Sequence, residues 1–148
     1  MPAHKSKTLA TWIALIGGSL GLHRFYLAGL RDLWGWLYPV PTLIGLYGVQ
    51  RMRDLGQDDQ LAWLLIPLLG IAVAAAMLSA IVYGLTSDER WWQARNPTEA
   101  TPARSGWLAI IGVILALLIG ASVLMATIAF SGQRYFEHEI EAAHEISR

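Results

Sequence analysis

The chain of 148 residues contains no cysteine and little charge, with 15% charged residues against roughly 25% in an average soluble domain. Without cysteine there are no disulfides, thiolate metal ligands or cysteine nucleophiles. The formal net charge of +0 leaves no basic excess to neutralise phosphates, which argues against nucleic acid as a partner. The charges are bunched between long apolar runs, and this pattern indicates that lipid is the main solvent.

Ionisable residues are also missing from three apolar runs, residues 8–22, 61–85 and 107–130. Proton relays and ion paths through a membrane use such residues, and intramembrane enzymes need a nucleophile, a base or a metal cluster at depth. The sequence therefore predicts no enzymatic activity, no cofactor and no metal site.

Run length decides which segments can cross a bilayer, whose apolar core of roughly 30 Å needs about 20 apolar residues. Residues 61–85 and 107–130 are long enough. Residues 8–22 reach this length only by continuing through residues 25–27, with His23 and Arg24 at headgroup depth. Residues 33–49 contain Pro39 and Pro41, so a kink is expected near residues 38–42. A re-entrant or interfacial segment is the alternative for residues 33–49, but the short turn before it favours a helical hairpin.

We therefore expect an all-α membrane protein with four transmembrane helices. Residues 1–55 form a hairpin of two helices, residues 56–133 a second pair with a connecting loop, and residues 134–148 a polar amphipathic tail. Tryptophan prefers membrane interfaces, and five of the seven tryptophans lie near predicted helix starts while two lie in a loop. These are Trp12, Trp34, Trp36, Trp63 and Trp107, with Trp91 and Trp92 in the loop. The basic N-terminus mimics a secretory signal, but bulky residues follow it, so we expect an uncleaved first helix.

The N-terminal third carries the only familiar motif. The segment KSKTLA, followed by GGSLGLHRFYLAG at residues 17–29, resembles the two-transmembrane (TM-two) domain family, in its bacterial form. That family is a pair of helices joined by a short turn, and the resemblance covers roughly residues 5–53. It implies a fold more than a function, because bacterial members are functionally poorly defined membrane proteins. Animal members carry Asp in place of His23, so the resemblance does not extend to a receptor-like signalling role.

Small residues four apart predict close helix packing in lipid. Gly17 and Gly21 favour packing within the hairpin over dimerisation. A second stripe in residues 61–85 is matched by one in residues 107–130, and these two faces are expected to meet. Their members are Ala72, Ala76, Ala80 and Gly84 on one side, and Gly112, Ala116 and Gly120 on the other.

The turn between the first two helices is the predicted contact site for lipid or a partner protein. Its candidate residues are His23, Arg24, Phe25, Tyr26 and Arg31. A guanidinium pairs bidentately with phosphate, whereas the commoner alternative is an arginine that only lifts its charge into the interface. In the turn itself, Gly29 is expected to set the reversal and Asp32 to cap the next helix.

The predicted role is a structural or interaction module of a bacterial inner membrane, which organises lipid, partner proteins or further copies of itself. The alternative is a small transporter or channel component, in which the Pro39 and Pro41 helix lines a path. Lys5 and Lys7 precede the first helix, and four spans would return the C-terminus to the same side, so both termini are expected in the cytoplasm. Glu141 and His144 have metal-site spacing, but a solvated acidic face is the favoured interpretation.

Overall fold

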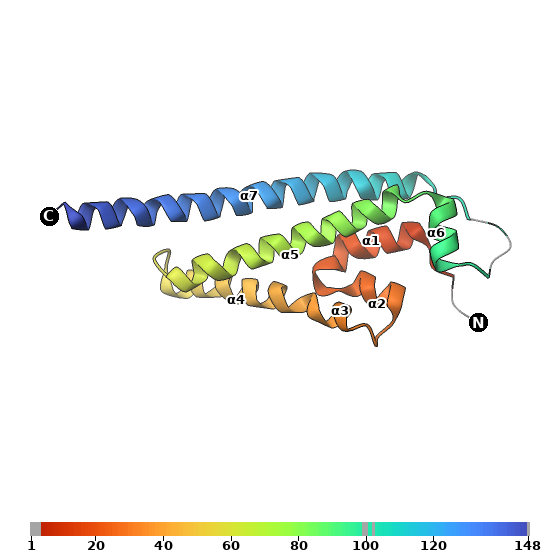
Figure 1. Cartoon of the computed structure of the whole chain (residues 1–148), viewed down its shortest axis with the longest axis horizontal. Coiled ribbons are helices and arrows are strands. Elements are labelled where there is room, and N and C mark those ends of the chain that lie inside the picture. Colours follow the sequence, from red (N-terminus) through yellow and green to blue (C-terminus); the bar gives the residue numbers. More distant parts are fainter. Residues whose placement is uncertain (1–3, 99–100, 102, 148) are drawn as a thin grey trace.

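The computed structural model describes residues 4–98, 101 and 103–147, and these residues form helices and no strand, as the sequence predicts. Most helices run along one long axis, and the N- and C-termini lie at opposite ends of it (Figure 1). The helices are α1 (Lys7–Gly17), the 3-10 turn η1 (Gly18–Leu20), α2 (Leu22–Ala28), α3 (Leu33–Leu37), α4 (Pro39–Leu55), α5 (Gln60–Leu85), α6 (Asp88–Arg95) and α7 (Trp107–Ile146).

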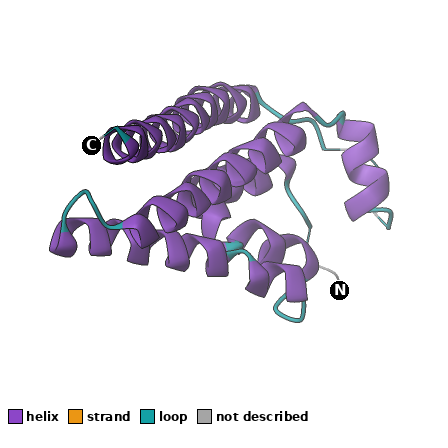
Figure 2. Ribbon diagram, turned by 60° about the vertical axis from the view of Figure 1, so that its left-hand side comes forward, coloured by secondary structure: helices purple, strands orange, loops and turns teal. Residues whose placement is uncertain are grey.

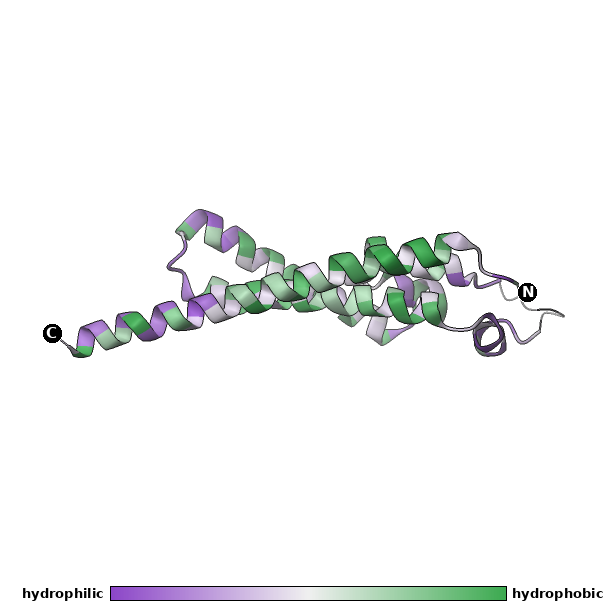
Figure 3. Cartoon of the chain, turned by 90° about the horizontal axis from the view of Figure 1, so that it is seen from above, coloured by the Kyte–Doolittle hydropathy of each residue, from purple (hydrophilic) through white to green (hydrophobic). Residues whose placement is uncertain are grey.

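Within the described residues only two helices, α5 and α7, are long and apolar enough to cross a membrane, not the predicted four. Figure 3 shows the hydrophobic middle of the bundle, with hydrophilic residues on α6 and along the free end of α7. Helix α5 is central, with α7 on one side of it and α3 and α4 on the other (Figure 2).

The first apolar run is not one helix, so its predicted continuation through residue 27 is wrong. Helix α1 ends at Gly17, η1 follows, and Gly21 takes a left-handed φ of 77°. The chain then returns as α2 beside α1 (Figure 1). The reversal needs glycine twice over, because a Cβ on Gly21 would be strained at this φ and would also collide with the carbonyl oxygen of Gly35.

The second run is almost continuous. Helices α3 and α4 are separated only by Tyr38, whose φ of −57° and ψ of −42° are themselves helical. Pro39 and Pro41 lie in the first turn of α4, where a missing N–H removes no helical hydrogen bond. The boundary between α3 and α4 thus lies at Tyr38, within the residues 38–42 where the prolines predict a kink. Further along α4, Gly48 lets the helix approach α5, since a Cβ there would lie 2.6 Å from the Cβ of Leu65.

Helices α5 and α7 run antiparallel and meet at intervals of seven residues. The facing pairs are Gly84 with Val113, Met77 with Gly120, Gly70 with Thr127, and Trp63 with Arg134. A seven-residue repeat keeps two gently supercoiled helices in register. The buried centre lies where α1 joins them, around Ala14, Ala76, Met77, Ala80 and Ala116.

Candidate functional site

The predicted contact residues lie on α2 and in the turn after it, but His23 is not at the surface. Its side chain is 0% exposed, and neither ring nitrogen has a hydrogen-bond partner. The ring packs edge-on against Tyr38 at 5.0 Å between centroids and against Tyr83 at 5.9 Å. The prediction that His23 contacts lipid headgroups or a partner is therefore wrong, and the residue fills the space between α2, α4 and α5.

Arg24 binds a carboxylate within its own chain. Its Nε donates to Oδ2 of Asp32 at 2.8 Å and its Nη2 to Oδ1 at 3.3 Å. This hydrogen bond from Arg24 holds the pKa of Asp32 below its ordinary value. Asp32 stands at the N-cap of α3, as expected, and the backbone amides of Trp34 and Gly35 also lower its pKa. The guanidinium thus closes the turn instead of reaching a phosphate.

Two aromatic residues of the motif also have internal partners. Phe25 meets the ring of Trp36 at 5.1 Å and lies beside Gly35, which has no Cβ to block it. The hydroxyl of Tyr26 accepts a hydrogen bond from the amide of Ser6 at 2.9 Å. Of the five candidates, only Arg31 is exposed.

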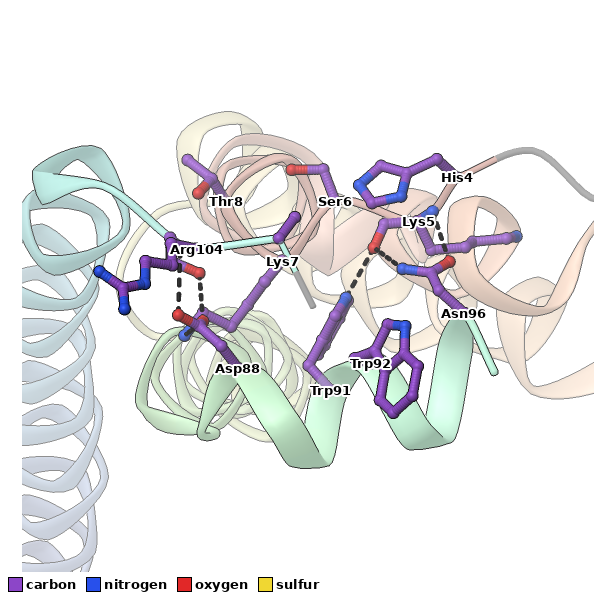
Figure 4. Close-up of a pocket in the computed structure, with 12 residues that line it drawn as sticks. His4, Lys5, Ser6, Lys7, Thr8, Asp88, Trp91, Trp92, Asn96 and Arg104 are labelled. Carbon is purple, nitrogen blue, oxygen red and sulfur yellow. Dashed lines mark hydrogen bonds and ion pairs between the residues drawn. The ribbon is translucent and has the colours of Figure 1, made fainter. Parts of the chain in front are cut away.

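A cluster that sequence reasoning missed joins the N-terminal segment to α6, and we call it the clasp: Lys5, Lys7, Asp88, Trp91 and Asn96 (Figure 4). Nζ of Lys7 lies 2.7 Å from Oδ1 of Asp88, and Nε1 of Trp91 donates to the carbonyl of Lys5 at 2.6 Å. The amide of Lys5 donates to Oδ1 of Asn96 at 2.9 Å. The paired residues of the clasp lie more than 80 residues apart in the chain, so no local sequence pattern indicates that they meet.

Burial and charge act in opposite directions on Asp88. Burial raises the pKa of this carboxyl, but hydrogen bonds from Lys7 and Ser105 outweigh it and lower the pKa to about 2. The cavity beside the clasp has a volume of about 40 Å³, room for a water molecule or two but not for an organic substrate. The clasp thus fastens the N-terminal segment to α6.

The predicted packing residues lie at two different interfaces. Ala72, Ala76 and Ala80 are buried, as are Gly112 and Ala116. A Cβ on Gly18 would lie 2.7 Å from that of Ala76, so part of the α5 stripe faces η1.

The remaining glycines divide in the same way. A Cβ on Gly112 would lie 2.9 Å from Cγ2 of Thr11 on α1, whereas Gly84 and Gly120 do lie between α5 and α7. The α1–α2 hairpin thus takes up much of the surface that was expected to join the two long helices. Gly17 is not in one helix with Gly21, and Leu22 fills the space beside it.

Charge is unevenly divided between the two ends of the molecule. Among the described residues, the end with the clasp and the α2–α3 turn carries Lys5, Lys7, Arg24, Arg31, Arg90, Arg95 and Arg104 against Asp32, Asp88 and Glu89. The other end carries Arg51, Arg53 and Arg134 against Asp54, Asp58, Asp59, Glu137, Glu139, Glu141 and Glu145. The molecule is thus basic at one end and acidic at the other.

Within the described part of the chain, no three His, Cys, Asp or Glu side chains are grouped so that they could hold a metal ion. Glu141 and His144 accordingly have no further ligand beside them there. The chain matches no protein-family model, no curated protein and no solved structure.

Proposed function

We propose that this protein is an integral membrane protein that acts as a structural or interaction module and does not turn over a substrate. One observation carries the proposal: the flanks of α5 and α7 expose large apolar side chains along their length. Leu64 is 73% exposed, Leu118 64%, Met125 71% and Ile128 64%. A protein in water rarely exposes apolar surface on this scale, whereas a bilayer covers it.

The fold supports three crossings, by α3–α4, α5 and α7, with α1–α2 as a hairpin that enters and leaves on the same side. Residues 33–50 hold no charged residue, so α3–α4 suits the apolar core. The clasp joins residues 5–7 to α6, and this contact supports an arrangement with both segments on one side of the membrane. Three crossings then place the C-terminus on the other side, and this arrangement replaces four spans with both termini in the cytoplasm.

The charge division supports an orientation. Cytoplasmic ends of membrane proteins carry an excess of lysine and arginine, and the clasp end holds seven of the eleven in the sequence. We place the clasp end in the cytoplasm and the free end of α7 outside, with a bacterial inner membrane as the setting.

A relationship to the two-transmembrane domain family is part of the proposal for residues 5–53. The motif residues have distinct structural tasks that support it: Gly21 reverses the chain, Arg24 closes the turn, and Gly29 ends α2 with a φ of 86°. Transport has less support. The carbonyl of Ser19 at the hairpin tip accepts a hydrogen bond from Thr42 at 2.6 Å and is therefore not available to a passing ion.

Membrane insertion and transport are tested together. We expect the protein to stay in the membrane pellet at alkaline pH in carbonate, and liposomes containing it to show the same proton and potassium flux as empty ones. Release into the carbonate supernatant would refute the membrane assignment. Flux above that of empty liposomes would refute the structural role in favour of a channel or transporter.

A further inference from the structure

The α2–α3 turn and the α4–α5 turn are built on the same sequence pattern. Residues 18–38 and residues 45–65 align without a gap, 27 positions apart. The alignment contains seven identities: Gly18 with Gly45, Gly21 with Gly48, Arg24 with Arg51, Gly29 with Gly56, Asp32 with Asp59, Trp36 with Trp63, and Leu37 with Leu64. The chain thus holds an internal repeat that is centred on these two turns.

The contacts inside the two turns repeat as well. In both, the arginine Nε donates to Oδ2 of the aspartate at 2.8 Å, and Nη2 donates to Oδ1 at 3.3 Å in the first turn and 2.9 Å in the second. In both, a glycine with a φ of 86° or 90° ends one helix and the aspartate is the N-cap of the next.

The tryptophan completes each turn by donating its Nε1 to the carbonyl of the residue that follows the glycine. This bond is 2.9 Å long to Leu30 and 2.8 Å long to Gln57. One local structure is therefore used twice. We call its two copies the first and second Arg–Asp–Trp turns, made of Arg24, Asp32 and Trp36 and of Arg51, Asp59 and Trp63.

The two Arg–Asp–Trp turns lie at opposite ends of α3–α4 (Figure 1). The stretch between them, residues 33–50, has no charged residue and is bounded by Asp32 of the first turn and Arg51 of the second. At 1.5 Å per residue this stretch extends about 27 Å, close to the roughly 30 Å of a bilayer's apolar core. Large apolar side chains are exposed along it, among them Leu37 by 53% and Leu43 by 59%. The turns thus stand at the two limits of an apolar belt that has the length of the bilayer core.

We propose that the two Arg–Asp–Trp turns are anchors that lie in the phospholipid headgroup layer, one at each surface of the membrane, and that together they fix the depth of the protein. The inference rests on the proposed membrane role and adds to it the places where the chain meets each surface. Tryptophan prefers this layer because its ring is apolar while its N–H needs a polar partner, and here the turn's own carbonyl is that partner.

The repeat itself favours headgroups over a protein partner. A protein bound at one end of the molecule would require the anchor only at that end, whereas a headgroup layer is present at both. The ion pair suits the same setting, because each aspartate neutralises the arginine beside it. The aspartate side chains are only 12% and 13% exposed, so the turn carries little free charge into the headgroup layer.

Nitroxide labels on single cysteines test the depth of both turns, since the sequence has no cysteine of its own. Leu30→Cys and Gln57→Cys are equivalent exposed positions of the two turns, and Ile44→Cys lies midway between them. Glu141→Cys, on the free end of α7, serves as the reference for water. In vesicles of dioleoyl phosphatidylcholine, we expect a water-soluble nickel chelate to relax the labels at 30 and 57 equally. This relaxation should be several-fold stronger than at 44 and several-fold weaker than at 141.

The anchoring residues are tested by removing one tryptophan at a time. Trp36→Ala should raise the nickel relaxation at residue 30 several-fold and leave residue 57 unchanged, and Trp63→Ala should do the converse, so each end is the control for the other. Unequal depths of the two turns, or no response to either tryptophan change, would overturn the proposal. Nickel relaxation at residue 44 as strong as at residue 57 would instead show that α3–α4 does not cross, a failure of the proposed membrane arrangement itself.

Discussion

At the scale of single residues, Asp88 gives the clearest prediction. Its pKa of about 2 lies below the ordinary 3.8, so its pairing with Lys7 stabilises the fold fully above the ordinary value and is lost as the pH falls through 2. Asp88→Asn should remove the pair at neutral pH, lower stability by about 1 to 3 kcal/mol and speed tryptic cleavage at Arg90 and Arg95. Glu89→Gln, an exposed change on the same helix, is the matched control, and equal cleavage of both variants would contradict the clasp.

Gly21 and Gly29 both have a positive φ, and a comparison of the two distinguishes the cost of backbone strain from the cost of a steric collision. A Cβ on Gly21 meets the carbonyl of Gly35, whereas a Cβ on Gly29 meets nothing within 4 Å. Gly29 has a φ of 86° and a ψ of 174°, a conformation that residues with a Cβ rarely adopt, so Gly29→Ala should lower stability by about 1 to 3 kcal/mol through backbone strain alone. Gly21→Ala should lower it further or prevent folding of the hairpin. Thermal unfolding in detergent measures both, and similar losses would argue against the close approach at Gly21.

At the scale of elements, the seven-residue register of α5 and α7 predicts which glycine of α7 is essential. A Cβ on Gly120 would lie 2.8 Å from the Cβ of Met77, while one on Gly132 meets nothing within 4 Å. Gly120→Leu should force the helices apart and lower stability by about 1 to 3 kcal/mol. Gly132→Leu should leave it unchanged or raise it slightly, since leucine is the better helix former. Denaturation in sodium dodecyl sulfate compares the two.

The elements differ in how far the sequence could predict them. Residues 61–85 and 107–130 were found because an uncharged run of spanning length is a local property, and α5 and the apolar part of α7 match it. The reversal at Gly21 was missed because hydropathy is nearly constant across it, although three glycines within residues 17–21 were the available signal.

The residues of the candidate site also differ in how far the sequence could predict them. Arg24 was identified as a residue of the turn, but its partner Asp32 became clear only when α2 folded back. The clasp depends on contacts between distant segments, which no periodicity reveals. Burial of His23 likewise follows from the packing of α2 against Tyr38 and Tyr83.

At the scale of the whole molecule, the charge division predicts which ends are accessible from outside the cell. In single-cysteine variants, Gln57→Cys lies at the acidic end and Gln93→Cys at the basic end. A membrane-impermeant maleimide should label residue 57 in intact cells and residue 93 only after the membrane is opened. The reverse pattern would invert the orientation, and labelling of both positions in intact cells would contradict three crossings.

The short α1–α2 hairpin also makes the molecule wider at one end of its long axis than at the other. It lies beside α5 and α7 only in the half nearest the N-terminus, while the opposite half holds α4, α5 and α7 alone (Figure 1). In the proposed membrane arrangement, the protein would occupy more area in the leaflet at the clasp end than in the other. A wedge of this kind relieves lateral pressure in a curved sheet, with the broad end on the convex side. Many copies gathered in one patch would bend the surrounding bilayer toward their narrow ends.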